Sequence, residues 1–412
     1  MSAAAPVEAP PARARLPHDV WAIAWTSLFS DWSYEMLLPI LPFFLAFELG
    51  ASPLVIGVVE GLAIFVQSLA QFVSGLRLAA RPDRRSVGTV GYATTTGAHA
   101  LIALATVWPV VAALRAGAWA GRGERQPIKR AILADASRRV GAGRSFGLEQ
   151  MFDSLGAVAG TASAAAVVLT EGLPGLRLVF AFSVLPGLVA VVLFRRLVRD
   201  QDRPLRAPVG PGGPARPAFS REFRWFLVAT TVFGLAFFNV LLGLLRVGTG
   251  LAAGGTGAVS AVLVALLAYL LYNLVYAGLA YPSGLVADRF SSLGLVTASF
   301  LLFAVVDGLF AQAPSVPVAL AAFLLAGAQL AFLDVGAAAW ISRAVPSADL
   351  GAAFGWFGAV QGGASLVASV LVGALWTYDS APLAFSVSAV LAIAGAACLA
   401  PIVFGARRRS AP

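Results

Sequence analysis

Long apolar stretches broken by short polar segments dominate the pattern of this chain. Most of them hold about twenty residues or more, which is the length an α-helix needs to cross a bilayer, and they lack the alternation of barrel strands. Hydrocarbon offers the backbone no hydrogen-bond partner, so such stretches must be helical. We predict an all-α membrane protein with twelve transmembrane helices, at 19–47, 53–76, 87–107, 109–121, 145–170, 176–196, 223–247, 258–285, 290–312, 317–342, 350–377 and 381–404. The fourth is expected to continue as a polar helix past Gly121.

The predicted helices fall into two related sets of six. Gly-Arg-Ser-Phe-Gly at 143–147 matches Gly-Ala-Ala-Phe-Gly at 351–355, and each opens the fifth helix of its set. Gly75 and Gly284 likewise hold equivalent places at the cytoplasmic end of the second helix of each set, which indicates a parallel six-plus-six repeat. We predict a cytoplasmic tail at 1–18, an N-terminal six-helix bundle at 19–199, a flexible linker at 200–221, a C-terminal six-helix bundle at 222–405 and a basic tail at 406–412.

The charge distribution predicts the orientation of these helices. The chain is 59% hydrophobic and 12% charged, whereas soluble proteins carry about 25% charged residues. Short loops rich in Lys and Arg stay in the cytoplasm. Every second connection between the predicted helices is rich in Lys and Arg. These connections hold Arg77, Arg81, Arg84, Arg85, Arg122, Arg125, Lys129, Arg130, Arg138, Arg139, Arg195, Arg196, Arg199, Arg203 and Arg206. Both termini are therefore expected in the cytoplasm of a bacterial cell with the chain in its inner membrane, and the net charge of +9 requires no nucleic-acid partner.

The composition removes several classes of chemistry. Cys398 is the single cysteine, and His18 and His99 are the two histidines, so we expect no disulfide and no metal site. The sequence also lacks a phosphate-binding glycine loop and a nucleophile elbow. We therefore expect no cofactor and no enzymatic activity.

Several motifs resemble the major facilitator superfamily. The stretch Gly284-Leu-Val-Ala-Asp288-Arg289 resembles the signature loop of that family, and the first half keeps Gly75, Arg84 and Arg85 with Ala79 in the place of the acid. The resemblance implies a transporter in which helices one, two, four and five of each half line the pathway. It also implies that these loop residues act as a cytoplasmic latch, which the loss of the acid puts in question.

A narrower resemblance points to a bacterial subgroup of drug or metabolite exporters. Its motifs are Ser30-Asp31-x-x-x-Glu35-Met36, followed by Pro39 and Pro42, and Gly-Arg-Gly-Glu-Arg-Gln-Pro at 121–127 with Arg130-Ala-Ile-Leu-Ala-Asp at 130–135. Arg115 holds the place of the arginine found in proton-coupled members. Gly156 and Gly160 resemble the glycine repeat of antiporters, with Thr161 in place of its proline.

Ionisable residues within the predicted helices are the candidate coupling residues, because a charge in the bilayer is costly unless it is paired or reaches water. Asp31 and Glu35 are four residues apart and share a helix face, with Glu35 about 18 Å from the outer end. Their repulsion favours exchange of a proton near neutral pH. The candidates for proton coupling are Asp31, Glu35, Asp153, Arg115, Glu60 and Asp334.

Structural roles are open for several of these residues. A structural role explains Arg115 equally well as a role in transport: a buried ion pair with Glu60 or Asp31 would hold two helices together. Asp153 is equally consistent with a brace for the packing around Gly156. Glu149 is expected at the cytoplasmic surface as a gate or loop anchor. For His99 we expect a local hydrogen bond on a lipid-facing helix, and for Asp307 a solvated rim position.

The second half supplies mostly uncharged polar and aromatic candidates. We predict that its polar residues shape the substrate side of the cavity, although each aromatic is individually explained by packing. These residues are Asn239, Tyr272, Asn273, Tyr276, Gln329, Trp356 and Gln361.

The sequence thus predicts a monomeric secondary transporter whose partners are a small-molecule substrate, protons and the lipid bilayer. Because acids outnumber bases among the residues expected to be buried, the first hypothesis is proton-coupled export of an amphipathic or cationic compound by alternating access. An uptake symporter or facilitator for a metabolite fits the same residues. A membrane sensor or assembly partner that has lost transport is the alternative of another class.

Overall fold

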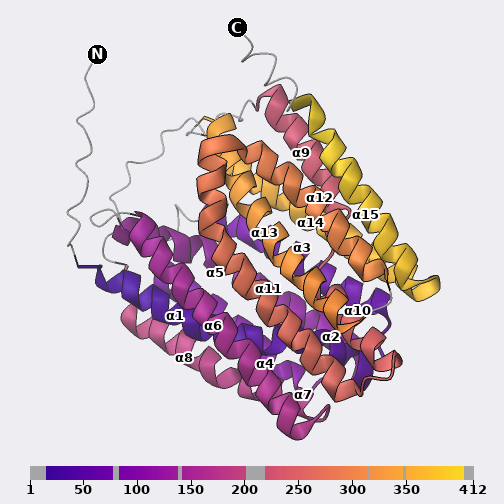
Figure 1. The fold of residues 1–412 in the computed structure, drawn as a ribbon. Helices are drawn as coiled ribbons and strands as arrows, with labels where there is room; N and C mark the ends of the chain where they lie inside the picture. The colour runs from indigo at the N-terminus through magenta and orange to yellow at the C-terminus, as the bar shows by residue number, and fades with distance from the viewer. Residues whose placement is uncertain are drawn as a thin grey trace, which may run out of the picture.

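The fold is a bundle of long helices. This computed structural model describes residues 15–77, 83–137, 142–200, 219–312, 315–346 and 349–402. In these ranges the chain is helical almost throughout and forms no β-strand. Figure 1 shows the earlier helices of the chain grouped on one side and the later helices on the other. The prediction of an all-α membrane protein is confirmed.

Each predicted span corresponds to one helix or to consecutive helical segments. In the first half these are α1 (His18–Leu37), η1 (Leu38–Ile40), α2 (Leu41–Phe43), η2 (Phe44–Glu48), α3 (Pro53–Arg77), α4 (Arg84–Ile102), α5 (Trp108–Ala136), α6 (Ala142–Glu171), α7 (Gly175–Phe182) and α8 (Val184–Leu197). In the second half they are α9 (Arg221–Gly234), α10 (Val240–Ala253), α11 (Ala258–Val286), η5 (Ala287–Ser291), α12 (Ser292–Ala311), α13 (Val316–Ala344), α14 (Leu350–Tyr378) and α15 (Ala381–Cys398).

The predicted spans differ in how well they suit a bilayer. Within the described residues, eight helical stretches are long and apolar enough to cross a membrane, with α7 and α8 taken as one. The other four predicted spans correspond to α1, α4, α5 and the α9–α10 pair. These segments carry charged side chains or hydroxyl groups, or are interrupted, because they build the polar interior of the bundle.

The first predicted span, 19–47, is not one regular helix. The α-helix ends at Leu37 and gives way to a 3₁₀ turn, a short α turn and a π turn. Pro39 and Pro42 explain the change, because proline has no N–H for the helix ladder and its ring clashes with the preceding turn. Pro127, by contrast, lies within the continuous helix α5.

The fourth span corrects one part of the sequence-based topology. α5 does continue past Gly121, as predicted, and it runs to Ala136. Arg122, Arg125 and Lys129, which the sequence assigned to a cytoplasmic connection, lie on this helix, with Arg125 and Lys129 buried and Arg122 half-buried. The correction follows from packing: a polar helix is stable here because neighbouring helices supply acidic and aromatic partners. Residues 138–141 lie outside the described residues, as do Ala79, Arg81 and most of the predicted tails and linker.

Glycines allow the close approach of α1 and α6. A Cβ on Gly160 would lie 2.6 Å from the carbonyl oxygen of Trp32, and one on Gly156 would overlap the carbonyl of Leu28. The repeat that resembles an antiporter motif therefore has a packing role in this structure. It brings the carboxyl-bearing faces of two helices within contact distance.

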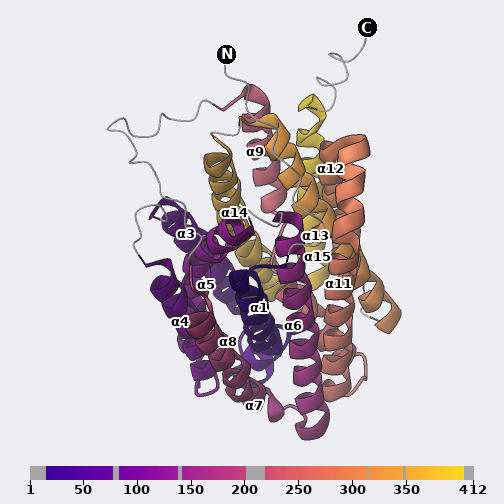
Figure 2. The same cartoon turned by 90° about the vertical axis from the view of Figure 1, so that its left-hand side faces the viewer.

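Two helix pairs join the earlier and later parts of the chain. α3 packs along α14, where Gly57 meets Ser369 and Gly61 meets Leu366. α6 packs beside α11, and Figure 2 shows this pair from the side. These contacts fix how the charged helices of the first half face the neutral helices of the second.

The ends of the helices form two different faces. One, which we call the basic face, carries Arg77, Arg84, Arg85, Arg195 and Arg196 at the ends of α3, α4 and α8. At the opposite face, Gly248 of α10 packs directly against the ring of Phe43. The contact is so close that a Cβ on Gly248 would overlap the ring. There Arg177 donates to the carbonyl oxygens of Ala103 and Ala105 at 2.9 Å.

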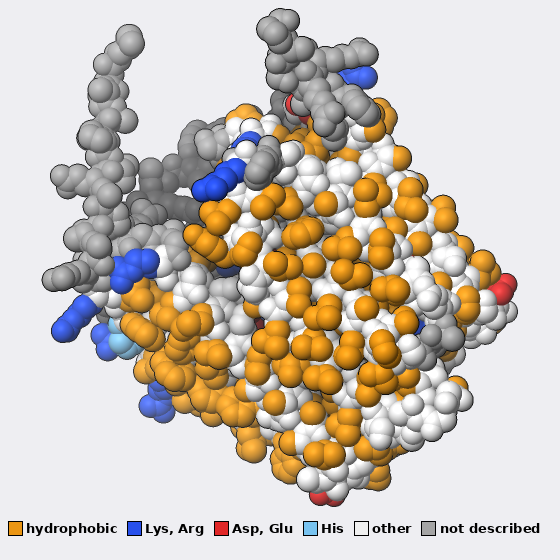
Figure 3. Space-filling model, in the orientation of Figure 1, with side chains coloured by type: hydrophobic (Ala, Val, Ile, Leu, Met, Phe, Trp, Pro, Cys, Tyr) orange, Lys and Arg blue, Asp and Glu red, His pale blue; other side chains and the backbone are white. Residues whose placement is uncertain are grey.

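Apolar side chains cover much of the outer surface. Figure 3 shows hydrophobic groups spread over the face formed by α11, α12 and α15. Leu301, Val305, Val390 and Ile393 are among the exposed apolar residues of these helices. Exposed apolar surface on this scale is expected of helices in contact with lipid.

Candidate functional site

A row of cationic side chains on α5 organises the interior of the first half. Arg115, Arg122, Arg125 and Lys129 are spaced by seven, three and four residues, which places them on one face of the helix. Each cation has an acidic or aromatic partner on a neighbouring helix, with acids on α1, α3 and α6 and the ring of Tyr92 on α4. Helix spacing therefore produces a charged strip within the bundle.

Asp31 and Asp153 meet beside this strip. Their carboxyl groups approach each other within hydrogen-bonding range between α1 and α6. Nη1 of Arg122 lies 3.7 Å from Oδ1 of Asp31, and Nη2 of Arg125 donates to Oγ of Ser30 at 3.0 Å. Carboxylate oxygens only accept hydrogen bonds, so Asp31 and Asp153 can hydrogen bond to each other only when one of them carries a proton.

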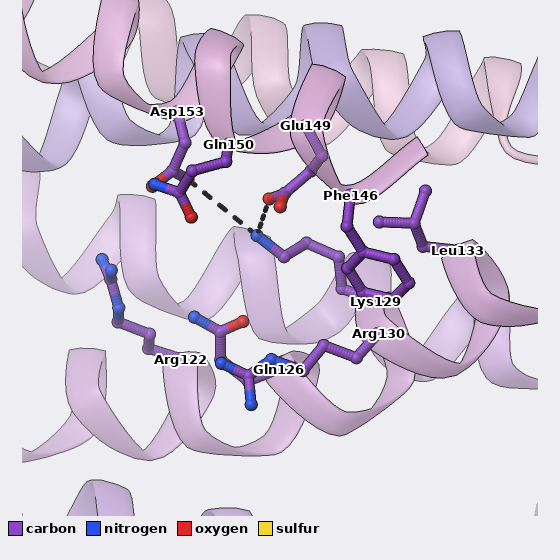
Figure 4. Close-up of a pocket in the computed structure, with 9 residues that line it drawn as sticks. All are labelled: Arg122, Gln126, Lys129, Arg130, Leu133, Phe146, Glu149, Gln150 and Asp153. Carbon is purple, nitrogen blue, oxygen red and sulfur yellow. Dashed lines mark hydrogen bonds and ion pairs between the residues drawn. The ribbon is translucent and has the colours of Figure 1, made fainter. Parts of the chain in front are cut away.

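Glu149 and Lys129 form the neighbouring ion pair. Nζ of Lys129 lies 2.5 Å from Oε1 of Glu149, and Oγ of Ser27 donates to the same oxygen at 2.8 Å. Nζ of Lys129 also lies 4.0 Å from Oδ1 of Asp153, as Figure 4 shows. Glu149, expected at the surface as a gate, is therefore buried in an ion pair that also contacts Asp153.

These groups line a cavity near the basic face. Its volume is about 480 Å³, and Asp135, close to the end of α5, pairs with Arg84 at that face. The lining is polar on both walls, with Leu133 and Phe146 as its apolar part. Figure 4 shows the lining residues: Arg122, Gln126, Lys129 and Arg130 from α5 face Glu149, Gln150 and Asp153 from α6.

Glu35 belongs to a different contact from that of Asp31. The hydroxyl of Tyr269 on α11 donates to Oε2 of Glu35 at 2.9 Å, and both residues are buried. The four-residue spacing does put Asp31 and Glu35 on one helix face, as predicted. Their hydrogen-bond partners differ, however, because α6 covers Asp31 while α11 reaches Glu35.

Arg115 and Glu60 form a fully buried bidentate pair. Nε and Nη2 of Arg115 donate to the two carboxylate oxygens of Glu60 at 2.8 and 3.0 Å. The guanidinium also lies over the ring of Trp119 at 4.3 Å, and His99 approaches it at 3.3 Å. His99 is therefore buried beside a cation rather than facing lipid. Of the two partners expected for Arg115, the structure places Glu60 against it.

Asn239 connects this pair to the second half. Its Nδ2 donates to Oε2 of Glu60 at 3.2 Å, while its Oδ1 accepts from the backbone N–H of Leu241 and caps α10. The side chain sits where the predicted span 223–247 is broken between α9 and α10. The break is what allows an amide side chain to reach the carboxylate of the other half.

The other second-half candidates are dispersed. Tyr276 donates to Oδ2 of Asp334 at 3.0 Å, and the side chain of Asp334 is exposed. Gln329 donates to Ser299 at 3.0 Å, and the ring of Tyr272 stacks on Tyr269 at 5.6 Å. The structure thus joins Tyr276 with Asp334 and separates them from Gln329. Asn273 has a buried Nδ2 with no partner in the described residues, Trp356 is exposed, and Gln361 is half-buried on α14.

The signature-loop residues of the first half form a local cluster. Arg84 donates to Asp135 at 2.9 Å and pairs closely with Asp200 after α8. Hydrogen bonds from Ser86 at the start of α4 lower the pKa of Asp83. Arg84 thus connects the ends of α4, α5 and α8 within the described residues, whatever the role of residue 79.

The remaining signature positions contribute little packing. A Cβ on Gly75 or Gly284 would meet no atom within 4 Å, so space alone does not require glycine there. Arg85 is half-buried and Arg289 is exposed, and the side chain of Asp288 lies outside the described residues.

Asp307 corrects a further expectation. It was expected at a solvated rim but is completely buried on α12, where Oγ of Ser388 lies 2.6 Å from its Oδ2. The same hydroxyl lies 2.9 Å from the carbonyl oxygen of Ala236, at the break after α9. The Ser388 hydroxyl has one proton and can donate it to one acceptor only. Both short contacts are hydrogen bonds when the hydroxyl donates to the carbonyl oxygen of Ala236 and a protonated Asp307 donates to the hydroxyl oxygen.

Sequence reasoning missed part of the site. Gln126, Gln150, Ser27 and Tyr269 were not singled out, and the cations of α5 were assigned to a loop. The available signal was the spacing of polar residues from 122 to 130, which follows the period of a helix.

A charged cavity inside a bundle of lipid-facing helices defines a membrane transport protein. The sequence profile of the Major Facilitator Superfamily matches residues 23–272 and 258–412. An uncharacterized MFS-type transporter of Methanocaldococcus jannaschii is 26% identical over 381 residues, covering 92% of this chain and 93% of that protein. An uncharacterized protein of Mycobacterium tuberculosis is 29% identical over 364 residues, covering 85% and 84%.

Solved structures share the fold at low sequence identity. A mutant of the nucleoside transporter NupG has a TM-score of 0.77 at 12% identity and covers 93% of this chain and 99% of its own. A mutant of the peptide transporter POT has a TM-score of 0.71 at 14% identity, covering 96% of both. The human organic anion transporter MFSD10 has a TM-score of 0.63 at 16% identity, covering 95% and 100%. The chain belongs to the Major Facilitator Superfamily and is a multi-pass membrane transporter of that type.

Proposed function

We propose that this chain is a proton-coupled secondary transporter of the bacterial inner membrane that works by alternating access. The observation that carries the proposal is the close approach of Asp31 and Asp153, two carboxyl groups that can share a proton next to a polar cavity. A proton carrier needs a group that binds and releases a proton within reach of the substrate site. Two acids that share one proton, beside Arg122 and Lys129, supply such a group.

The arrangement of contacts supports an alternating-access cycle. The cavity lies near the basic face, which the positive-inside rule assigns to the cytoplasm together with both termini. Farther from that face, Tyr269 contacts Glu35 and Asn239 contacts Glu60 across the two halves. Opening toward the outside would require these contacts to separate while the halves close over the cavity. The charged network and the cavity lie within one chain, so a monomer is the expected unit.

Two directions of transport follow from two kinds of substrate. Export by exchange with protons, the first expectation from the sequence, suits a cation that competes with protons for the carboxylates. That expectation left Arg122, Lys129 and Arg130 out of the site. Arg122, Lys129 and Arg130 in the cavity wall favour the second candidate, uptake together with protons. The direction of flux under an imposed pH gradient separates the two.

Proton movement in proteoliposomes tests the proposal. Vesicles that hold a pH-sensitive dye are exposed to a panel of organic anions, cations and neutral compounds. A substrate is expected to change the internal pH, and Asp31→Asn, Asp153→Asn and Glu35→Gln are each expected to abolish that change while the protein stays folded. Asp379→Asn, at an exposed site after α14, is the matched control and should keep it.

Two results would contradict the proposal. Proton movement that persists unchanged in both Asp31→Asn and Asp153→Asn would show that the shared proton plays no part in transport. Substrate flux without any proton movement in the wild-type protein would identify a facilitator instead.

A further inference from the structure

The cavity wall formed by α5 presents cations that are not matched by hydrogen-bonded acids. Three of the nine lining residues are cationic, namely Arg122, Lys129 and Arg130, and two are acidic, namely Glu149 and Asp153. Lys129 is satisfied by its short ion pair with Glu149. The two arginines are therefore the groups available to a ligand.

Neither arginine is saturated by the protein. Nη1 of Arg122 is buried without a hydrogen bond among the described residues, and its ion-pair partner Asp31 is 3.7 Å away. Arg130 is exposed and makes no hydrogen bond or ion pair within the described ranges. Arg130 interacts with the Tyr276–Asp334 pair at electrostatic range only. A guanidinium with free N–H groups is the preferred protein group for binding carboxylates, sulfonates or phosphates.

Helix geometry places an amide between these arginines. Arg122, Gln126 and Arg130 are spaced by four residues, so their side chains lie along one face of α5. Figure 4 shows them on the wall opposite Asp153 and Gln150. Leu133 and Phe146 add an apolar portion to the lining. The combination suits an organic anion with an apolar body and a volume well below 480 Å³.

Building on the proposed function, we propose that Arg122, Gln126 and Arg130 bind an organic anion, and that the anion is carried in the same direction as the proton held by Asp31 and Asp153. Asp31 and the anion serve as alternative counter-charges for Arg122. A proton added to the acid pair removes one negative charge near Arg122 and strengthens binding of the anion. Binding linkage is reciprocal, so the anion also strengthens proton binding.

All charged groups around the acid pair enter this linkage. On α5 they are Arg122, Arg125 and Lys129, on α1 Glu35, and on α6 Glu149. Lys129 and Glu149 compensate each other, and Glu35 is held by Tyr269 from α11. The net effect of a proton on the pair is therefore an increase in positive charge at the cavity wall. A cationic ligand would bind less tightly under the same change.

Two permanently charged probes of similar size test the proposal. Benzenesulfonate stays anionic and benzyltrimethylammonium stays cationic at every relevant pH, so any pH dependence belongs to the protein. Binding to the purified full-length protein in detergent is measured by isothermal titration calorimetry at pH 6 and pH 8. We expect benzenesulfonate to bind, with an affinity roughly tenfold higher at pH 6, and to take up protons, seen as a dependence of the heat on the buffer.

Three variants sharpen the test. Arg130→Gln is expected to weaken benzenesulfonate binding about tenfold or more, because a hydrogen-bonded charge contact is lost. Gln126→Glu adds a negative charge to the same wall and should weaken it at least as much. Arg196→Gln, an exposed arginine at the end of α8, is the control and should bind as the wild type does. Both cavity positions lie at the water-accessible wall, so thermal unfolding should confirm that the variants are folded.

The results that overturn the proposal differ from those that overturn the transport function. Tighter binding of benzyltrimethylammonium, binding of benzenesulfonate that strengthens from pH 6 to pH 8, or no binding of benzenesulfonate would each refute the anion site. A cation that moves protons in the proteoliposome assay would refute it too, while supporting proton-coupled transport. Absence of proton movement with the wild-type protein in that assay, with benzenesulfonate still bound, would refute the transport function and the shared direction of transport, while the anion site would stand.

Discussion

The buried Arg115–Glu60 pair allows a quantitative test of whether it is a structural lock. Glu60→Gln would leave the Arg115 guanidinium, which has no solvent exposure, with neutral partners only. Removing one member of a buried ion pair costs about 3–5 kcal/mol, because the remaining charge is desolvated and uncompensated. The rings of Trp119 and the nitrogen of His99 compensate part of this charge, so the lower end of the range is expected.

The assay is thermal unfolding of the purified protein in one detergent at a fixed scan rate. An effect of about 3 kcal/mol corresponds to a decrease in the apparent melting temperature of roughly 3–4 °C for a chain of this length. The double variant with Arg115→Gln removes both charges, and two neutral amides can hydrogen bond to each other. It should be more stable than the sum of the single effects predicts, by about 1–3 kcal/mol.

One outcome would refute this reasoning. If Glu60→Gln melts within about 1 °C of the wild type and loses transport, the pair acts in the transport cycle and does not lock the helices. Arg196→Gln, at an exposed helix end, is the matched control for loss of an arginine and should leave the melting temperature unchanged.

Three further predictions concern packing, the basic face and a buried acid. Gly160→Ala should destabilise the protein by about 1–3 kcal/mol, since its Cβ would overlap α1, while Gly147→Ala, with open space, should not; both are read from thermal unfolding. Arg84→Ala should cost about 2 kcal/mol through the loss of two carboxylate partners, and Arg85→Ala, at a half-buried site, should cost little. Asp307→Asn should keep the wild-type melting temperature, because a neutral amide also satisfies the serine hydroxyl; a large decrease would indicate a charged carboxylate.

Most of the fold was predictable because lipid imposes simple requirements on sequence. A helix in contact with hydrocarbon must be apolar over about twenty residues, and breaks between such stretches are conspicuous. The interruptions inside spans were harder to place. The breaks at Ser183 and before Asn239 lie in apolar sequence, so periodicity gives no sign of them.

The candidate site was predictable in its residue types but less so in its partners. Charges in apolar helices identified Asp31, Glu35, Glu60 and Arg115 from sequence alone. The sequence could not show that Asp31 contacts Asp153, because that choice depends on how closely α1 approaches α6. It predicted that α5 continues past Gly121, but it assigned the cations of that polar end to a cytoplasmic connection, since a helix end rich in charges resembles a solvated one unless its partners are known.

The contrast between α5 and the helices that face it has a consequence for how such a protein can change. The ionisable groups around Asp31 and Asp153 belong to the first half, whereas Tyr269 and Asn239 of the second half reach Glu35 and Glu60 through neutral groups. Substitutions among α10, α11 and α13 can therefore alter the shape offered to a solute while the acid–base chemistry is left intact. Evolution toward new solutes would be expected to alter the neutral wall first.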